Sequence, residues 1–194
     1  GWWSFVLSPP LLTAFGIADP AAMSVAGSYS SGLLSPYVAM SGSGTYIYAS
    51  RFDGTDVLNL PAGQAISRVT TLPAGGSDLV VSGSTLLLAS EEGGVRPYNI
   101  ASPGAPAALP RLDTIGSSHD LAVQGTRCYS AEREGGLAVV NIANPAGITL
   151  MGSTIGTFPS RVEDVEEAEG TQGTGATDED RPRTPRTVRD GDVP

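Results

Sequence analysis

The sequence predicts an all-β protein built from repeated units of four short strands. Glycine and proline are abundant, with 25 and 15 residues among 194, so turns are frequent and a helical bundle is disfavoured. Apolar residues make up 40% of the chain, which is enough to form a core. The third observation is a short motif that recurs at a regular interval along the chain.

The motif is clearest as Asn-Ile-Ala-Asn-Pro at 141–145, which Asn-Ile-Ala-Ser-Pro at 99–103 matches. Residues 59–61 (Asn-Leu-Pro) are a shortened copy, and residues 16–20 read Gly-Ile-Ala-Asp-Pro. The copies are 43, 40 and 42 residues apart. Four short strands in about 42 residues make one blade of a β-propeller. An antiparallel sandwich, the alternative, predicts strands without this period.

Each unit is predicted to contain strands A to D in chain order. Strand A begins with Asp-Leu-x-Val at Asp78 or Asp120, and a glycine turn joins it to strand B. An acidic glycine turn then leads to strand C, and an Asx-Pro turn leads to strand D, which spans 148–153 in the last whole unit. Glycine permits positive φ, and Asn or Asp before proline starts a turn. Strand C at 137–140 is apolar without alternation, which is typical of a strand buried between two blades.

The repeats assign residues 1–165 to one β-propeller domain. The predicted units are a partial one at about 2–29, whole ones at about 36–75, 77–115 and 119–155, and the start of a further one at 161–165. Residues 166–194 contain Val188 and Val193 as their only large aliphatic side chains. This acidic stretch, rich in Pro, Gly and Thr, is expected to be disordered because it has little to bury.

About four blades of four antiparallel strands leave two arrangements open. Residues 161–165 and 2–29 together make one blade, and their pairing would close a small ring. Alternatively the chain is a partial propeller, an arc belonging to a longer gene product. An arc has apolar blade faces at its ends, so self-association is then expected.

The single histidine and single cysteine restrict the chemistry. They exclude a disulfide framework and metal sites built from several His or Cys side chains. His119 precedes Asp120 and follows two serines, but no Gly-x-Ser-x-Gly turn surrounds them, so a triad is not expected. We expect His119 to be a loop residue at the entry to strand A, and Cys128 to be a buried, inert thiol.

Carboxylates recur at equivalent places in the units. Asp78, Asp120 and Asp164 each begin strand A, and three related carboxylates around one axis could bind Ca²⁺. The alternative, which we favour, is that each Asp accepts backbone N–H bonds in its own loop, so that no cofactor is required. The turns between strands B and C are expected to lie on the same face and to give it a negative potential. The candidate binding residues on this face are Asp53, Asp78, Glu91, Glu92, His119, Asp120, Glu132 and Glu134.

The net charge of −9 argues against a nucleic-acid partner. Residues 5–23, the longest apolar stretch, contain three prolines and Asp19, so no membrane span is expected. Residues 1–23 lack an initial Met and a basic segment, and are not expected to be an intact signal peptide.

Residues 127–153 resemble an LVIVD repeat. The resemblance lies in Cys-Tyr-Ser-Ala at 128–131, Gly-Leu-Ala-Val-Val-Asn-Ile-Ala-Asn-Pro at 136–145 and Met-Gly-Ser at 151–153. It implies a β-propeller, of the kind found in secreted or cell-surface bacterial and archaeal proteins. Departures are Asn99 and Asn141, where the family usually has Asp, and Pro97 within one strand C.

Two functions follow as hypotheses. The first is a non-catalytic propeller scaffold, extracellular or on the cell surface, that binds a protein or a glycan. The second is a lactonase-like hydrolase that uses Asp78, Asp120 and His119 with a divalent metal. The repeat carries no catalytic motif, which favours the scaffold.

Overall fold

The computed structural model describes residues 3–8, 11–16, 24–32, 35–62, 64–91, 93–154, 162 and 165. These residues form four antiparallel sheets, three of them with four strands and one with three. The helical structure among them is one 3-10 turn, η1 (Pro145–Gly147). The prediction of an all-β, propeller-like fold is confirmed. The predicted tail, 166–194, lies outside the described residues.

The sheets follow one another in chain order. The first contains β1 (Trp3–Ser8), β2 (Leu11–Gly16) and β3 (Ser24–Ser30). The second contains β4 (Ala39–Ser43), β5 (Tyr46–Arg51), β6 (Gly54–Asn59) and β7 (Ser67–Leu72). The third contains β8 (Asp78–Ser82), β9 (Thr85–Ala89), β10 (Val95–Asn99) and β11 (Ala107–Ala108). The fourth contains β12 (Asp120–Gln124), β13 (Arg127–Ala131), β14 (Leu137–Asn141) and β15 (Thr149–Thr154).

The three four-stranded sheets share one internal geometry. In each, a two-residue turn joins strands A and B, and its glycine has a φ near +60° (Gly44, Gly83 and Gly125). The register between strands C and D shifts after Val57 in the second sheet and after Val139 in the fourth. The first sheet has the same shift between β2 and β3, after Ala14. This register identifies β1, β2 and β3 as strands B, C and D, so strand A is missing from the first sheet among the described residues.

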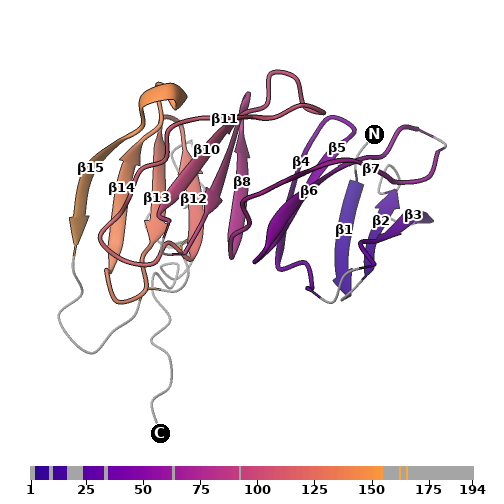
Figure 1. The fold of residues 1–194 in the computed structure, drawn as a ribbon, viewed down its shortest axis with the longest axis horizontal. Helices are drawn as coiled ribbons and strands as arrows, with labels where there is room; N and C mark the ends of the chain where they lie inside the picture. Colours follow the sequence, from indigo (N-terminus) through magenta and orange to yellow (C-terminus); the bar gives the residue numbers. More distant parts are fainter. Residues whose placement is uncertain are drawn as a thin grey trace, which may run out of the picture.

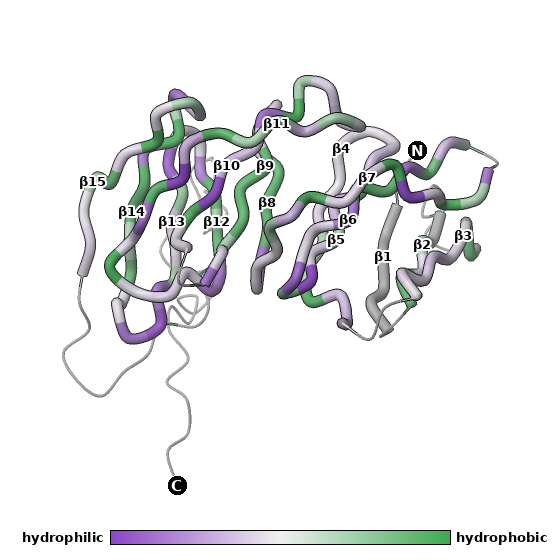
Figure 2. The backbone as a smooth tube through the Cα atoms, viewed as in Figure 1, coloured by the Kyte–Doolittle hydropathy of each residue, from purple (hydrophilic) through white to green (hydrophobic). Residues whose placement is uncertain are grey.

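Three apolar cores lie between successive sheets. Leu12 and Ala14 of the first sheet pack against the second, and Tyr48 and Val57 of the second pack against the third. Leu87 and its neighbours on the third sheet pack against the fourth. The middle strands of the second and third sheets are therefore largely buried on both faces. In the fourth sheet, β14 alternates between buried and half-buried residues. The prediction that this strand is buried between two blades is wrong, because the described residues place a sheet on one side of it only. Figure 2 shows hydrophobic stretches along β8, β9 and β14.

The four sheets form an open arc, with β1–β3 at one end and β12–β15 at the other (Figure 1). Val162 pairs with Arg133 at the end of the fourth sheet. The small closed ring within one chain is not formed by the described residues, because the first and fourth sheets lie at opposite ends of the arc (Figure 1). The other prediction, a partial propeller, is the arrangement observed.

Candidate functional site

The turns between strands B and C meet the connections between strands D and A on one face of the arc. Glu91 of one such turn forms a bridge with Ser118 of the following connection, and Arg133 of the next turn bridges Val162. This face is at the bottom of Figure 1. We call it the turn face.

Asp78 and Asp120 begin strands at the turn face, and each binds the backbone of the following unit. Asp78 Oδ2 accepts a hydrogen bond of 3.0 Å from the N–H of Leu121, and Asp120 Oδ2 accepts one of 2.8 Å from the N–H of Val165. Burial raises the pKa of Asp78, although N–H groups that point at its carboxylate act in the opposite direction. Backbone N–H bonds were expected, but within each loop. The observed bonds instead link successive sheets.

In the described part of the chain, no cluster of side chains supports the metal hypothesis. There, no group of three or more His, Cys, Asp or Glu side chains is close enough to hold a metal ion. Ala39 occupies the position of Asp78 in the second sheet, so the carboxylates do not recur in every unit. Asp164, the third candidate ligand, lies outside the described residues, as does Glu92.

His119 lies between Glu91 and Arg133 where two turns meet. Its Nδ1 is 2.9 Å from Arg133 Nη2 and 3.3 Å from Glu91 Oε1, and Arg133 Nη2 is 3.2 Å from the same carboxylate oxygen. A guanidinium only donates, so Nδ1 is the acceptor in the contact with Arg133. His119 thereby links two turns, and its Nδ1 is occupied.

Glu132 was predicted to lie on the charged surface of the acidic turns, but it is buried. Its side chain is only 1% exposed, and its Oε2 accepts a 2.5 Å hydrogen bond from the Thr114 hydroxyl. The prediction that Glu132 contributes to a charged surface is wrong, because the last residue before the turn points inward between two sheets. Asp53 is exposed and forms a 3.0 Å ion pair with Arg51, and Glu134 is exposed.

A buried polar network in the second sheet was not predicted from the sequence. Asp56 is 0% exposed, and it accepts hydrogen bonds from the hydroxyls of Tyr37 and Thr71 and from Arg51 Nη1. Burial and the hydrogen bond to Asp56 raise the pKa of Tyr37. The available signal was a charged residue in the middle of a strand that is otherwise buried. Because both carboxylate oxygens of Asp56 accept hydrogen bonds, this network stabilises the sheet.

Cys128 is buried, as expected. Burial, with the neighbouring Asp78 and Glu132 carboxylates, raises the pKa of its thiol to about 12. The thiol is therefore protonated at neutral pH and unreactive.

Acidic residues are confined to the half of each unit next to the turn face. Every acid that the structure describes lies in a turn between strands B and C, in a connection between strands D and A, or within three residues of the start of a strand at this face. These acids are Asp53, Asp56, Asp78, Glu91, Asp113, Asp120, Glu132 and Glu134. The opposite face has no described acid. Arginines of the turn face pair with three of these acids, in the ion pairs Arg51–Asp53, Arg111–Asp113 and Arg133–Glu91.

Comparison with known families identifies one unit directly. Residues 115–155 match the LVIVD repeat. This stretch contains the whole of the fourth sheet, and the predicted resemblance to LVIVD repeats is confirmed. The LVIVD match and the stacked sheets together describe a β-propeller-like module.

Solved structures share the fold at low sequence identity. One is a functionally unknown protein from Desulfotomaculum acetoxidans DSM 771, with a TM-score of 0.64 and 14% identity over 79% of this chain and 52% of that one. Another is the computationally designed Ika8 protein, with a TM-score of 0.55 and 15% identity over 84% of this chain and 50% of that one. The chain thus spans about half the length of each. No curated protein matches its sequence.

Proposed function

We propose that the chain is a non-catalytic LVIVD-type β-propeller module that uses its turn face to bind a partner. The observation that carries this proposal is the confinement of the described acids to that face. Stacking places the turns of successive sheets side by side, so that loops of variable sequence stand on a rigid framework. Such a surface suits a partner of opposite charge.

The side chains singled out for hydrolysis have other roles. Asp78 and Asp120 accept backbone N–H groups, and His119 Nδ1 accepts from Arg133. No observation favours the lactonase-like alternative. Of the two partner classes, a basic protein segment fits the acidic face better than a glycan does. An extracellular or cell-surface location rests on the LVIVD resemblance alone. The described part of the chain has no helix able to span a membrane.

The test measures binding of an oligolysine peptide at several salt concentrations. Asp53→Asn combined with Glu134→Gln removes two charges from the turn face. The matched control, Gln64→Arg with Gln124→Arg, changes the net charge equally but at exposed positions away from this face. We expect the first pair to slow association several-fold at low salt and to flatten its salt dependence, because steering acts over about 10 Å.

The control pair should change association much less. Equal effects of the two pairs would mean that the peptide senses only net charge, and the turn face would then lose its support as the binding surface. An unchanged rate in both pairs would exclude electrostatic steering altogether.

A further inference from the structure

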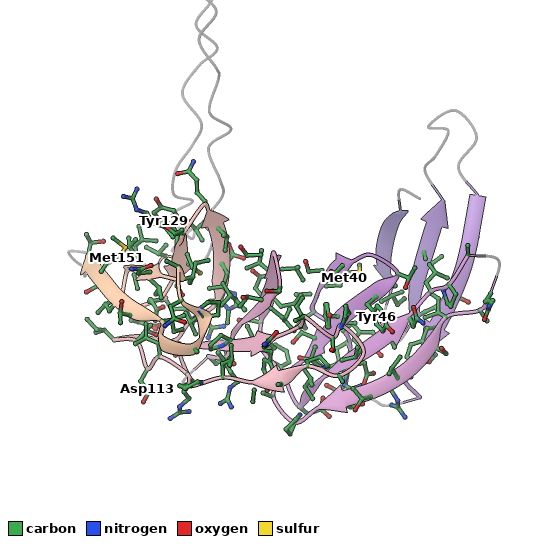
Figure 3. All side chains as sticks on the ribbon, turned by 90° about the horizontal axis from the view of Figure 1, so that it is seen from above. Met40, Tyr46, Asp113, Tyr129 and Met151 are labelled. Atoms are coloured by element: carbon green, nitrogen blue, oxygen red, sulfur yellow. The ribbon has the colours of Figure 1, made fainter. Side chains whose placement is uncertain are left out.

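The fourth sheet has an apolar face that no sheet of the described residues covers. Tyr129, Leu137 and Val139 lie on the side of this sheet away from the third, and we call them the end face (Figure 3 labels Tyr129). Tyr48 and Leu87 hold the register position of Tyr129 in the two preceding sheets, and both are 0% exposed. Tyr129 is only partly buried. The end face is therefore equivalent to the faces that form the sheet-to-sheet interfaces, but no described sheet packs against it.

The backbone at the end face is already arranged as the start of another sheet. Val162 pairs with Arg133 as Ser118 pairs with Glu91, and Val165 donates to Asp120 as Leu121 donates to Asp78. In the third-to-fourth junction, Ser118 lies just before strand A and Leu121 is its second residue. Val162 and Val165 thus mark where strand A of a following sheet begins.

The opposite end of the arc has the complementary gap. The first sheet contains strands B, C and D, and its β1 edge pairs with no other strand among the described residues. Leu12 and Ala14 turn towards the second sheet. The other side of the first sheet has no sheet against it in the described part of the chain.

We propose that two copies of this chain close one ring. The first sheet of each copy would cover the end face of the other copy, and the segment at Val162–Val165 would supply the missing strand A along β1. The contact joins unlike surfaces and occurs twice, so a two-fold arrangement leaves no exposed end. The ring has eight sheets, and the chain spans about half the length of both solved structures that it matches. This proposal does not depend on the partner proposed for the turn face.

The first test is the mass of the purified chain in solution, measured by sedimentation over a range of concentrations. We expect twice the mass of one chain. Val139→Arg places a charge on the end face and should reduce the mass to that of one chain. Met151→Arg in the same sheet is the control, because Met151 is 55% exposed on the outer strand and should leave the dimer intact.

The second test uses the β1 edge. Successive N–H groups of a strand point to opposite sides. Of the two variants Phe5→Pro and Val6→Pro, one therefore removes an N–H from the open edge of β1, and the other removes an N–H from its pairing with β2. Only the variant with an unchanged circular dichroism spectrum is used. We expect it to be monomeric, and a mixture with Val139→Arg to form dimers, because one intact interface remains between the two variants.

The proposal would be overturned if the wild-type chain were monomeric at about 100 µM, which would mean that the Kd of the dimer is about 100 µM or weaker. Species heavier than a dimer would show that the contact does not close with two copies. The head-to-tail contact would also be excluded if Val139→Arg remained dimeric. The same conclusion would follow if the mixture of Val139→Arg with the proline variant did not form dimers.

Discussion

At the scale of single residues, the carboxylate of Asp78 links two sheets. Replacing it in Asp78→Ala leaves the N–H of Leu121 without its acceptor, which should lower the free energy of unfolding by about 1–3 kcal/mol. Asp78→Asn keeps an acceptor oxygen and should recover most of this loss. Urea denaturation provides the measurement. Asp113→Ala, at an exposed carboxylate, is the control and should stay within about 0.5 kcal/mol of wild type.

Cys128 gives the protein a dependence on alkaline pH. Its folded-state pKa of about 12 lies above the ordinary value of 9.0, so the folded protein holds this proton more tightly than the unfolded chain. The resulting stability is intact below pH 9 and is lost as the pH rises towards 12, with a slope of at most about 1.4 kcal/mol per pH unit. We expect Cys128→Ala to show a shallower decline over this range. Parallel curves would contradict the assignment.

Residue roles divide into those that sequence could give and those that it could not. The buried thiol of Cys128 followed from its apolar neighbours. The burial of Glu132 did not, because Glu91 in the preceding turn has the same chemistry and a partly exposed side chain. The difference arises from Thr114, which reaches Glu132 only after two sheets have stacked. The direction of the Asp78 bond also depends on stacking, which a local motif does not encode.

At the scale of elements, the turn after strand C depends on its asparagine. Asn99 and Asn141 each accept the N–H of the residue two positions later. Asn59 has no such donor, because the residue two positions later is Pro61, and its buried Oδ1 lacks a partner among the described residues. The shortened motif in the sequence thus has a physical consequence.

This difference predicts unequal effects of one substitution. Asn99→Ala and Asn141→Ala should each cost about 0.5–1.5 kcal/mol in the free energy of unfolding. Asn59→Ala should cost nearly nothing or stabilise, because it removes an unsatisfied buried acceptor. Chemical denaturation of the three variants is the measurement. Equal losses would show that the side-chain bonds do not maintain the turns.

Glycines allow the connections between sheets to approach the strands closely. A Cβ atom at Gly76 would lie 2.1 Å from the carbonyl oxygen of Ala89, and one at Gly116 would lie 2.2 Å from that of Glu132. We expect Gly76→Ala and Gly116→Ala to cost about 3 kcal/mol, because backbone must move. Gly152→Ala, where nothing lies within 4 Å, should be nearly neutral. Thermal melting distinguishes these outcomes.

At the scale of the whole molecule, the repeat period was sufficient to predict the sheets but not the curvature of the arc. Each unit specifies its own strands through glycine turns and apolar runs. The angle between units is set by how side chains such as Tyr48 and Leu87 interlock. The sum of these small angles determines whether the ends of one chain meet, and no single sequence motif encodes that sum. The sequence also predicted that the turns between strands B and C share one face, and they do, because turns at equivalent positions stack together. A binding role for that face stays a prediction.

The stacking of sheets in chain order also determines how the protein should unfold. In the four described sheets, every strand pairs only with its neighbours in sequence, so the contact order is low and each sheet can form on its own timescale. Stability then propagates between nearest neighbours, as in a one-dimensional chain of coupled units. In a single copy, amide hydrogen exchange should be slowest in β8–β10 and faster towards both ends, so that opening begins at the terminal sheets and advances inward.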